Sequence, residues 1–600
     1  MRYFLIIFLL SSSLYSQEVL SPLNSNPNSY NYLSSKNKSA LLIPFFDDFS
    51  YSSNILDNNL WLGNSALVNR NYPINPPTIG VVTLDGLDSI GYPYDISLAN
   101  NHGFADVLLS QIINLSNLDS VFLMFYHQPQ GYGDNPQSED SLFLEYLSVD
   151  SLGFKVWTRV WELAGETLSE FKKNVIMITD PKYLHDSFQF RFRNYATLSG
   201  NFDHWHLDYI ILDQYTSSLD TSGLNDVAFV YNSPSFLKRY KEMPWIHFQD
   251  DFLAEINDSV NILLRNNQAS INVDYQYNVY ENNIIIDHYP NLGTSRNISV
   301  LDYDSIGNYT FENPSISINN NIFPSNFQDS SEFMIEHIIS TGSNDYKYND
   351  TLVHYQRFNS HFSYDDGSVE SAYGINVQGA MGAYQFRLNR PDTLRAVQIY
   401  FPQMLDTVNA ISFLLTVWDD NNGNPGSIIH QQLEYPMHTK LNQYHFYYLD
   451  SLFQLTDVFY VGWTQKSSTM LNIGLDKNSI ANDYMFYNVG GLWNTSQYTG
   501  AWMIRPLVSM SNLFLSNHNN NNNNNNNSLT IFPNPSSSYI NIKTFSSSNL
   551  MSLFDLSGKM IFQKSINEYY KFDSKNFNSG IYILKIENHL GVFNRKLIFY

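Results

Sequence analysis

The chain has 600 residues, too many for one hydrophobic core, so several domains are expected. Lysine and arginine number 33 against 56 aspartates and glutamates, and the net charge of −23 argues against nucleic acid as a partner. Cysteine is absent, which excludes disulfides, thiolate metal sites, cysteine nucleophiles and a lipid anchor on an N-terminal cysteine. Stability must then come from packing and not from disulfides.

The first residues have the pattern of a secretory signal peptide. Met1-Arg2 supplies a positive start, residues 3–10 are apolar, and small serines follow. We expect cleavage after Ser16, which makes residues 1–16 the signal peptide. The apolar run is too short to cross a bilayer, and no later segment reaches the roughly 18 apolar residues required. The sequence therefore predicts no transmembrane span. Residues 17–40, rich in Asn, Ser and Pro, are expected to form a flexible leader.

Composition predicts an all-β protein. Aromatic residues make up 16% of the chain and charged residues only 15%, with Asn and Ser between short apolar runs. This profile is typical of strand-rich domains with polar loops. We expect tandem β-sandwich domains followed by a small C-terminal β-sandwich.

The first sandwich is predicted over residues 41–215 as a jelly roll. Strand patterns occur at 121–126, 142–146, 157–161 and 175–178. Phe188, Phe190 and Phe192 alternate with Gln189, Arg191 and Arg193, which indicates one apolar and one polar face. No helix is evident, and about ten strands are expected. The stretch resembles the receptor-type and carbohydrate-binding jelly rolls of secreted bacterial surface proteins, a likeness of fold only.

Two further sandwiches are predicted. In residues 216–358, apolar positions from Ile271 to Val279 alternate with polar ones, as in a half-buried strand, and an immunoglobulin-like sandwich is expected. Residues 359–512 show strand patterns at 383–388, 394–401, 411–418 and 458–465, and a second jelly roll is expected.

The C-terminal end differs in composition from the rest. Residues 513–528 contain nine consecutive asparagines, and such a polar repeat cannot bury a core, so a flexible linker is expected. Residues 529–600 hold eight Lys and Arg against four Asp and Glu, a charge of +4, which leaves −27 for the remainder. This change of sign supports a module boundary.

Four motifs occur in order within residues 529–600. They are Phe532-Pro533-Asn534-Pro535, then Leu553 to Lys559, then Ser579-Gly580-Ile581-Tyr582, then Lys596-Leu597-Ile598. The tail resembles the C-terminal sorting domain (type A) of type IX secretion cargo. The resemblance implies export through the periplasm to the cell surface or medium, with the secretion machinery as a partner. The residues that carry it are Pro533, Asn534, Pro535, Leu553, Asp555, Gly558, Lys559, Gly580, Tyr582 and Lys596.

One group of residues has metal-ligand chemistry. His204, His206 and Asp208 are two apart, so on a strand they share a face, and imidazole and carboxylate both bind metals. Because Ile210 and Leu212 continue that face inward, a structural cluster with histidine bonded to Asp208 is favoured, and a calcium-type role for Asp208 stays open. The acidic run from Asp419 lacks the EF-hand glycine and glutamate and predicts a hairpin turn instead. No cofactor is expected.

A catalytic motif is not evident. Gly-x-Ser-x-Gly, His-Glu-x-x-His and P-loop patterns are missing from the sequence. A non-enzymatic adhesion, binding or scaffold role is therefore favoured, with a glycan or a surface protein as ligand. The alternative is a secreted glycosidase or peptidase with its site in residues 41–215.

A triplet of Asp, then Ser or Thr, then an aliphatic residue recurs along the chain. Asp-Ser turns before strands explain it, and it also resembles the O-glycosylation acceptor of bacteria that use this secretion route. Its hydroxyl residues are Ser89, Ser120, Ser141, Ser151, Ser259, Ser305, Thr351, Thr393, Thr407 and Ser451.

Overall fold

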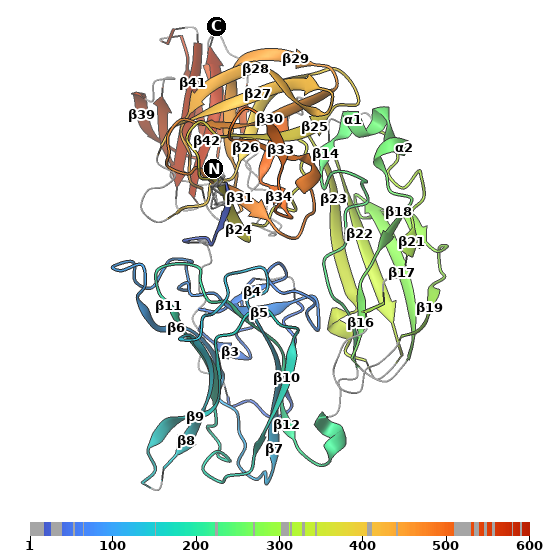
Figure 1. The fold of residues 1–600 in the computed structure, drawn as a ribbon, viewed down its shortest axis with the longest axis vertical. Helices are drawn as coiled ribbons and strands as arrows, with labels where there is room; N and C mark the ends of the chain where they lie inside the picture. Colours follow the sequence, from blue (N-terminus) through green and yellow to red (C-terminus); the bar gives the residue numbers. More distant parts are fainter. Residues whose placement is uncertain are drawn as a thin grey trace, which may run out of the picture. The chain divides into compact units, whose positions relative to one another are not determined.

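The computed structural model describes residues 17–508 and 530–599. Short gaps lie at 26–38, 52–53, 64, 151, 222–225, 268–270, 302–310, 313–314, 327–329, 343–344, 405–410, 440–441, 533–538, 545–548, 555–558, 576, 579 and 589–590. The chain forms two compact units, Met1–Ser509 and Met510–Tyr600. Strands dominate both units, which confirms the all-β class (Figure 1). The boundaries expected between individual sandwiches stay predictions, as do the predicted ends of the linker.

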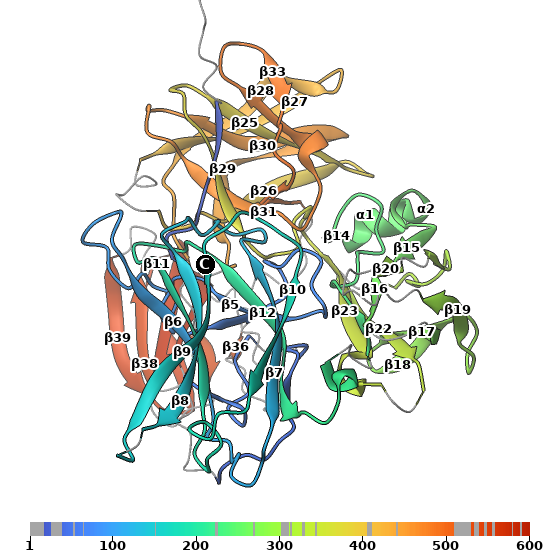
Figure 2. The ribbon, with the colours of Figure 1, turned by 60° about the horizontal axis from the view of Figure 1, so that its bottom comes forward.

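The first sandwich consists of two sheets that face each other (Figures 1 and 2). A six-stranded sheet has the order β10-β7-β12-β5-β4, with β2 on β12, and a five-stranded sheet has the order β3-β6-β11-β8-β9. The strands are β2 (Phe45–Asp47), β3 (Trp61–Leu62), β4 (Leu67–Asn69), β5 (Val81–Leu84), β6 (His102–Ser110), β7 (Val121–Pro129), β8 (Ser141–Val149), β9 (Lys155–Ala164), β10 (Lys172–Ile178), β11 (Phe190–Thr197) and β12 (Trp205–Gln214).

The core between these sheets follows from the alternation along the strands. Phe190 and Phe192 are fully buried against Phe45, Trp61 and Phe125, while Arg191 and Arg193 point to the other side. The six-stranded sheet is buried on both faces, because a second cluster with Phe122 and Tyr209 covers its outer side. On the outer face of the five-stranded sheet, solvent reaches Phe104 and Arg159, while Phe143 and Glu145 are buried.

The next part of the chain has a six-stranded sheet of order β14-β23-β22-β17-β18, with β19 on β17. Two smaller sheets, β13-β16-β20 and β15-β21, belong to the same part. The elements are β13 (Val227–Phe229), β14 (Met243–Pro244), α1 (Trp245–Asp250), α2 (Phe252–Glu255), β15 (Ser259–Asn261), β16 (Leu264–Asn266), β17 (Ile271–Glu281), β18 (Ile284–Tyr289), β19 (Arg296–Leu301), β20 (Phe311–Glu312), β21 (Ser315–Ser317), β22 (Ser331–Ser340) and β23 (Thr351–Asn359).

The last part of the larger unit has three sheets of order β1-β24-β31-β34, β28-β27-β30-β25-β32-β33 and β29-β26-β35. It shares one hydrophobic core with the preceding part. The predicted turn after Asp419 joins β27 to β28 through Asn422 and Gly423, both with positive φ. The strands are β1 (Glu18–Ser21), β24 (Ser371–Ile375), β25 (Met381–Arg387), β26 (Asp392–Ile399), β27 (Phe413–Asn421), β28 (Asn424–Glu434), β29 (His445–Leu455), β30 (Val458–Gln465), β31 (Asn472–Asp476), β32 (Met485–Asn488), β33 (Trp493–Thr495), β34 (Ala501–Trp502) and β35 (Ile504–Leu507).

Strand β1 corrects one expectation. Residues 17–25 were expected in the flexible leader, yet Glu18–Ser21 pairs antiparallel with β24, more than 350 residues away. Leu23 is fully buried and Ser25 nearly so. The composition of the leader is polar, but these particular side chains have buried partners in the folded chain, which composition does not show.

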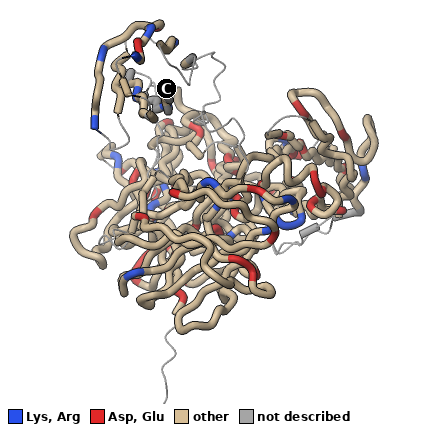
Figure 3. The backbone as a smooth tube through the Cα atoms, turned by 90° about the horizontal axis from the view of Figure 1, so that it is seen from above, with Lys and Arg blue, Asp and Glu red and all other residues tan. Residues whose placement is uncertain are grey.

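The C-terminal unit has a three-stranded sheet, β36-β37-β40, and a four-stranded sheet, β39-β38-β41-β42. Its core contains Ile540, Leu553, Phe572, Leu584 and Leu597. Lys and Arg positions recur along this unit (Figure 3), in line with its charge of +4. The strands are β36 (Thr530–Phe532), β37 (Tyr539–Lys543), β38 (Asn549–Phe554), β39 (Met560–Ile566), β40 (Tyr569–Asp573), β41 (Gly580–Asn588) and β42 (Gly591–Phe599).

Candidate functional site

The open face of the five-stranded sheet carries arginines in cross-strand rows. In one row Arg191 on β11 lies opposite Glu145 on β8, which lies opposite Arg159 on β9. In the next row Arg193 lies opposite Phe143. Residues directly opposite each other in an antiparallel pair share a face with Cβ atoms about 5 Å apart, so these side chains form a contiguous lattice.

Each guanidinium group of the lattice covers an aromatic ring. The Cζ atom of Arg159 lies 3.7 Å from the ring centroid of Phe143, and that of Arg193 lies 3.8 Å from the centroid of Phe104. Arg191 covers Trp157 at 4.1 Å. These distances are within the range of cation–π attraction, which holds the arginine side chains flat against the sheet. The N–H groups at the edges of the guanidinium planes then lie along the surface of the sheet.

A carboxylate ties two of these arginines together. Arg191 Nε donates to Glu145 Oε2 at 2.6 Å, and Arg193 Nη1 lies 3.8 Å from the same oxygen. The buried Nε of Arg193 has no hydrogen-bond partner among the described residues. Burial, and then the positive charge of Arg191, lower the pKa of Arg193. Arg193 therefore lies beside the positive charges of Arg191 and Arg159, with Glu145 as the carboxylate near it.

We name this surface the arginine–aromatic face, comprising Phe104, Phe143, Glu145, Trp157, Arg159, Arg191, Arg193 and Tyr195. Solvent reaches it, since the Phe104 residue is 46% exposed and the Arg159 side chain 43%. Glu162 lies opposite Phe143 and so shares this face. The three arginines, Glu145 and Glu162 together give it a charge of +1, on a chain whose net charge is −23. The alternation of residues 188–193 indicated Arg191 and Arg193 but not Arg159, and the rings that Arg191 and Arg193 cover come from other strands.

The candidate metal residues lie elsewhere, at the start of β12. His204 and His206 are buried, and burial lowers the pKa of His206 to about 4 and that of His204 well below its usual value. His206 Nδ1 lies 2.8 Å from Thr83 Oγ1, and His204 Nδ1 accepts from the backbone N–H of Asp134 at 3.1 Å. The neutral rings pack tightly against Gly131 and Gly133. A Cβ atom added to either glycine would lie within 2.6 Å of a ring atom of His206 or His204. The environment is typical of structural histidines.

Asp208 has partners other than the histidines. Its Oδ2 accepts from the Thr78 N–H at 3.0 Å, and its Oδ1 from the Tyr209 N–H at 2.6 Å. The expected bond between histidine and Asp208 is not among the contacts of the described residues, where the Asp208 oxygens are bonded to Thr78 and Tyr209 instead. Among the described residues, no three His, Asp or Glu side chains are grouped so as to hold a metal ion. A structural role for the cluster, like the calcium-type role of Asp208, stays a proposal.

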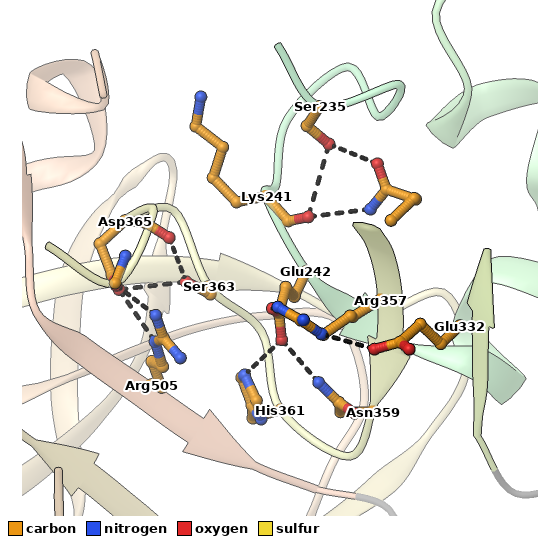
Figure 4. A network of polar contacts seen from close by, with 12 residues as sticks. Ser235, Lys241, Glu242, Glu332, Arg357, Asn359, His361, Ser363, Asp365 and Arg505 are labelled. Carbon is orange, nitrogen blue, oxygen red and sulfur yellow. Dashed lines mark hydrogen bonds and ion pairs between the residues drawn. The ribbon is translucent and has the colours of Figure 1, made fainter. Parts of the chain in front are cut away.

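A second group of charged residues surrounds Glu242, which directly precedes β14 and meets residues at the end of β23 and just after it (Figure 4). Glu242 accepts from Asn359 Nδ2 at 2.5 Å, and its carboxylate lies 3.2 Å from His361 Nε2 and 3.9 Å from Arg357 Nη1. Burial raises the pKa of Glu242, but His361, Arg505 and Arg357 outweigh it and hold the pKa at about 2. A carboxylate held ionised by three partners is suited to joining segments and not to proton transfer.

The C-terminal motif residues lie partly within the described part of the chain. Leu553 is fully buried opposite Leu584, and Tyr582 packs on Phe599 and donates to the Asn578 carbonyl at 2.7 Å. Gly580 begins β41, Lys596 pairs with Ile583, and Lys559 is exposed. Pro533, Asn534, Pro535, Asp555 and Gly558 lie outside the described residues. The apolar residues of the sorting motifs, Leu553 and Tyr582, therefore belong to the core of the small unit.

Residues 530–600 match the family described as the secretion system C-terminal sorting domain. The tail is a sorting domain of the type IX secretion system. The chain is therefore exported to the cell surface or the extracellular space, and its tail interacts with the secretion machinery. No helix in the described part of the chain is long and apolar enough to cross a membrane. No curated protein matches the chain.

Solved structures resemble the chain only weakly. A family 16 carbohydrate-binding module has a TM-score of 0.18 and 13% identity, covering 27% of this chain and 100% of its own. The tandem CBM22 domains of Paenibacillus barcinonensis Xyn10C have a TM-score of 0.19 and 8% identity, covering 76% and 100%. A biofilm-associated protein BSP domain has a TM-score of 0.15 and 8% identity, covering 91% and 98%. These likenesses identify neither a ligand nor an activity.

Proposed function

We propose that this exported chain is a non-enzymatic binding protein of the cell exterior, and that its arginine–aromatic face binds an acidic polysaccharide. The observation that carries the proposal is the lattice of Arg159, Arg191 and Arg193 over aromatic rings on an open sheet face. Adhesion or scaffolding at the surface would follow from such binding. The finer assignments of a signal peptide at residues 1–16 and an immunoglobulin-like fold at 216–358 belong to the same proposal.

The chemistry of the face favours a sugar polymer with carboxylate groups. Planar guanidinium groups pair with carboxylates through two parallel hydrogen bonds, and the aromatic rings beneath them hold these groups flat at the surface. A flat sheet face fits an extended polymer better than a small molecule, which needs a concave site. A net charge of −23 repels acidic polymers elsewhere on the chain, so the positive face gives the contact its orientation.

The test is binding of the purified full chain to acidic and neutral polysaccharides. We expect saturable binding to at least one of alginate, polygalacturonate and hyaluronan that weakens with added salt, and weaker binding to dextran. The combined variant Arg159→Gln, Arg191→Gln and Arg193→Gln should lose at least tenfold in affinity. The combined variant Lys172→Gln, Arg387→Gln and Arg390→Gln removes the same charge from exposed positions and should bind as the wild type does.

Equal loss in both combined variants would show that only the total charge matters and would contradict the assignment of the face. The absence of saturable binding to every acidic polymer would do the same. If the full chain instead cleaves glycans or peptides with saturable kinetics, the hydrolase alternative within residues 41–215 replaces this proposal.

A further inference from the structure

We propose that the edge of β24 is a strand-acceptor site, and that residues 17–25 occupy it as a separable peptide ligand. The segment adds β1 to the sheet β1-β24-β31-β34, with Glu18 opposite Ile375 and Ser21 opposite Ala372. The Asn376 N–H donates to the Gln17 carbonyl at 2.9 Å and extends the ladder by one residue. This is the addition of an extended peptide to a sheet edge, in which main-chain bonds supply affinity.

A polar pocket selects the side chain at the start of the segment. Glu18 is 1% exposed, and its carboxylate accepts from the Tyr373 hydroxyl at 2.7 Å and from the Gln497 N–H at 3.2 Å. Ser496 donates its hydroxyl to the same carboxylate, and Tyr498 donates to the Glu18 carbonyl at 3.3 Å. Hydrogen bonds to a buried carboxylate are roughly twice as strong as neutral ones, so this pocket discriminates glutamate from other residues.

An apolar pocket holds the other end of the segment. Leu23 is fully buried with Val369, Ala372, Tyr400 and Met503. Between the two anchors, Val19 and Leu20 are half-buried. The site therefore recognises an extended peptide with glutamate at one position and leucine five residues later.

The same segment also contacts the first sandwich. The Leu23 carbonyl accepts from the Asn201 N–H at 3.0 Å, and Asn24 Nδ2 donates to the Ser199 carbonyl at 2.9 Å. One short peptide thus bonds to two sandwiches at once. Its release would leave the β24 edge unpaired and open to another strand, and unpaired edges are the usual points of strand exchange between chains.

The test uses the full mature chain with a protease site inserted between Asn28 and Lys36. After cleavage, the body is incubated with a fluorescent peptide, Gln-Glu-Val-Leu-Ser-Pro-Leu-Asn-Ser, which copies residues 17–25. We expect the labelled peptide to replace the resident one and to bind saturably, as measured by fluorescence anisotropy. A peptide with Glu18→Gln should bind at least tenfold more weakly, and a peptide with Leu23→Asp should not bind measurably.

The matched control is a peptide with Val19→Thr, because Val19 is only half-buried and its β-branched replacement keeps the strand shape. It should bind within threefold of the parent peptide. The proposal is overturned if the cleaved body binds none of the peptides while keeping its thermal unfolding temperature, or if Glu18→Gln binds as well as the parent.

If cleavage unfolds the body, the uncleaved variant Glu18→Gln is examined by hydrogen exchange. Faster exchange confined to β1 and β24 supports the proposal, and unchanged exchange there contradicts it. Polysaccharide binding is unaffected by this outcome, since the two sites share no residue.

Discussion

Replacing Glu242 with glutamine should destabilise the larger unit strongly at neutral pH. The substitution keeps the size of the side chain and removes the charge that His361, Arg505 and Arg357 stabilise. The pKa of Glu242 falls from 4.5 to about 2 on folding, and each pKa unit corresponds to about 1.4 kcal/mol. Loss of the charge should thus cost about 3 kcal/mol of unfolding free energy at pH 7.

The sign of the pH dependence follows from the lowered pKa. The folded state holds the carboxylate ionised at pH values where the unfolded chain binds a proton, so the stabilisation is complete above pH 4.5 and declines as pH falls towards 2. The difference between wild type and Glu242→Gln should therefore shrink to less than half between pH 7 and pH 3. Urea unfolding followed by tryptophan fluorescence is a suitable assay, because buried Trp245 is three residues away.

The control is Glu332→Gln, which removes the exposed partner of Arg357 at 2.7 Å. An exposed ion pair contributes about 0 to 1 kcal/mol, so this variant should unfold almost as the wild type does. A Glu242→Gln variant no less stable than Glu332→Gln at pH 7 would refute the reasoning. A difference that does not change between pH 7 and pH 3 would refute it equally.

Three further predictions concern export, the histidine cluster and glycosylation. Deletion of residues 529–600 in the native host should leave a folded protein in the periplasm, and fractionation that finds it at the surface would disprove the dependence on the tail. Gly133→Ala should lower the thermal unfolding temperature because its Cβ would lie 2.4 Å from the His204 ring, whereas Gly490→Ala, with open space at its Cβ and no left-handed backbone, should cost less. If the Asp-Ser/Thr triplets are glycosylated, mass spectrometry should find more glycan on exposed hydroxyls than on half-buried ones. The exposed hydroxyls are those of Ser89, Ser259, Thr351 and Ser451, and the half-buried ones are those of Ser120, Ser141 and Thr393. Higher occupancy of the half-buried hydroxyls would contradict this expectation.

Local patterns predicted the strands and the export route. The alternation from Ile271 to Val279 lies within β17, and that from Phe188 to Arg193 leads into β11, which begins at Phe190, because a period of two places apolar side chains on one face whatever strand lies beside it. The sorting motifs were equally local, since each comprises a few adjacent residues. Leu553 and Tyr582 were identified in this way, and both are buried in the small unit.

The pairing of distant strands required the tertiary structure. Glu18 lies in a polar stretch that resembles a flexible leader, and only the fold brings Tyr373 and Ser496 around its carboxylate. Arg191 and Arg193 were expected on a polar face, but Trp157 and Phe104 lie under them because β9 and β6 belong to the same sheet as β11. Register between strands far apart in the chain depends on the packing of the whole core, and no local pattern contains it.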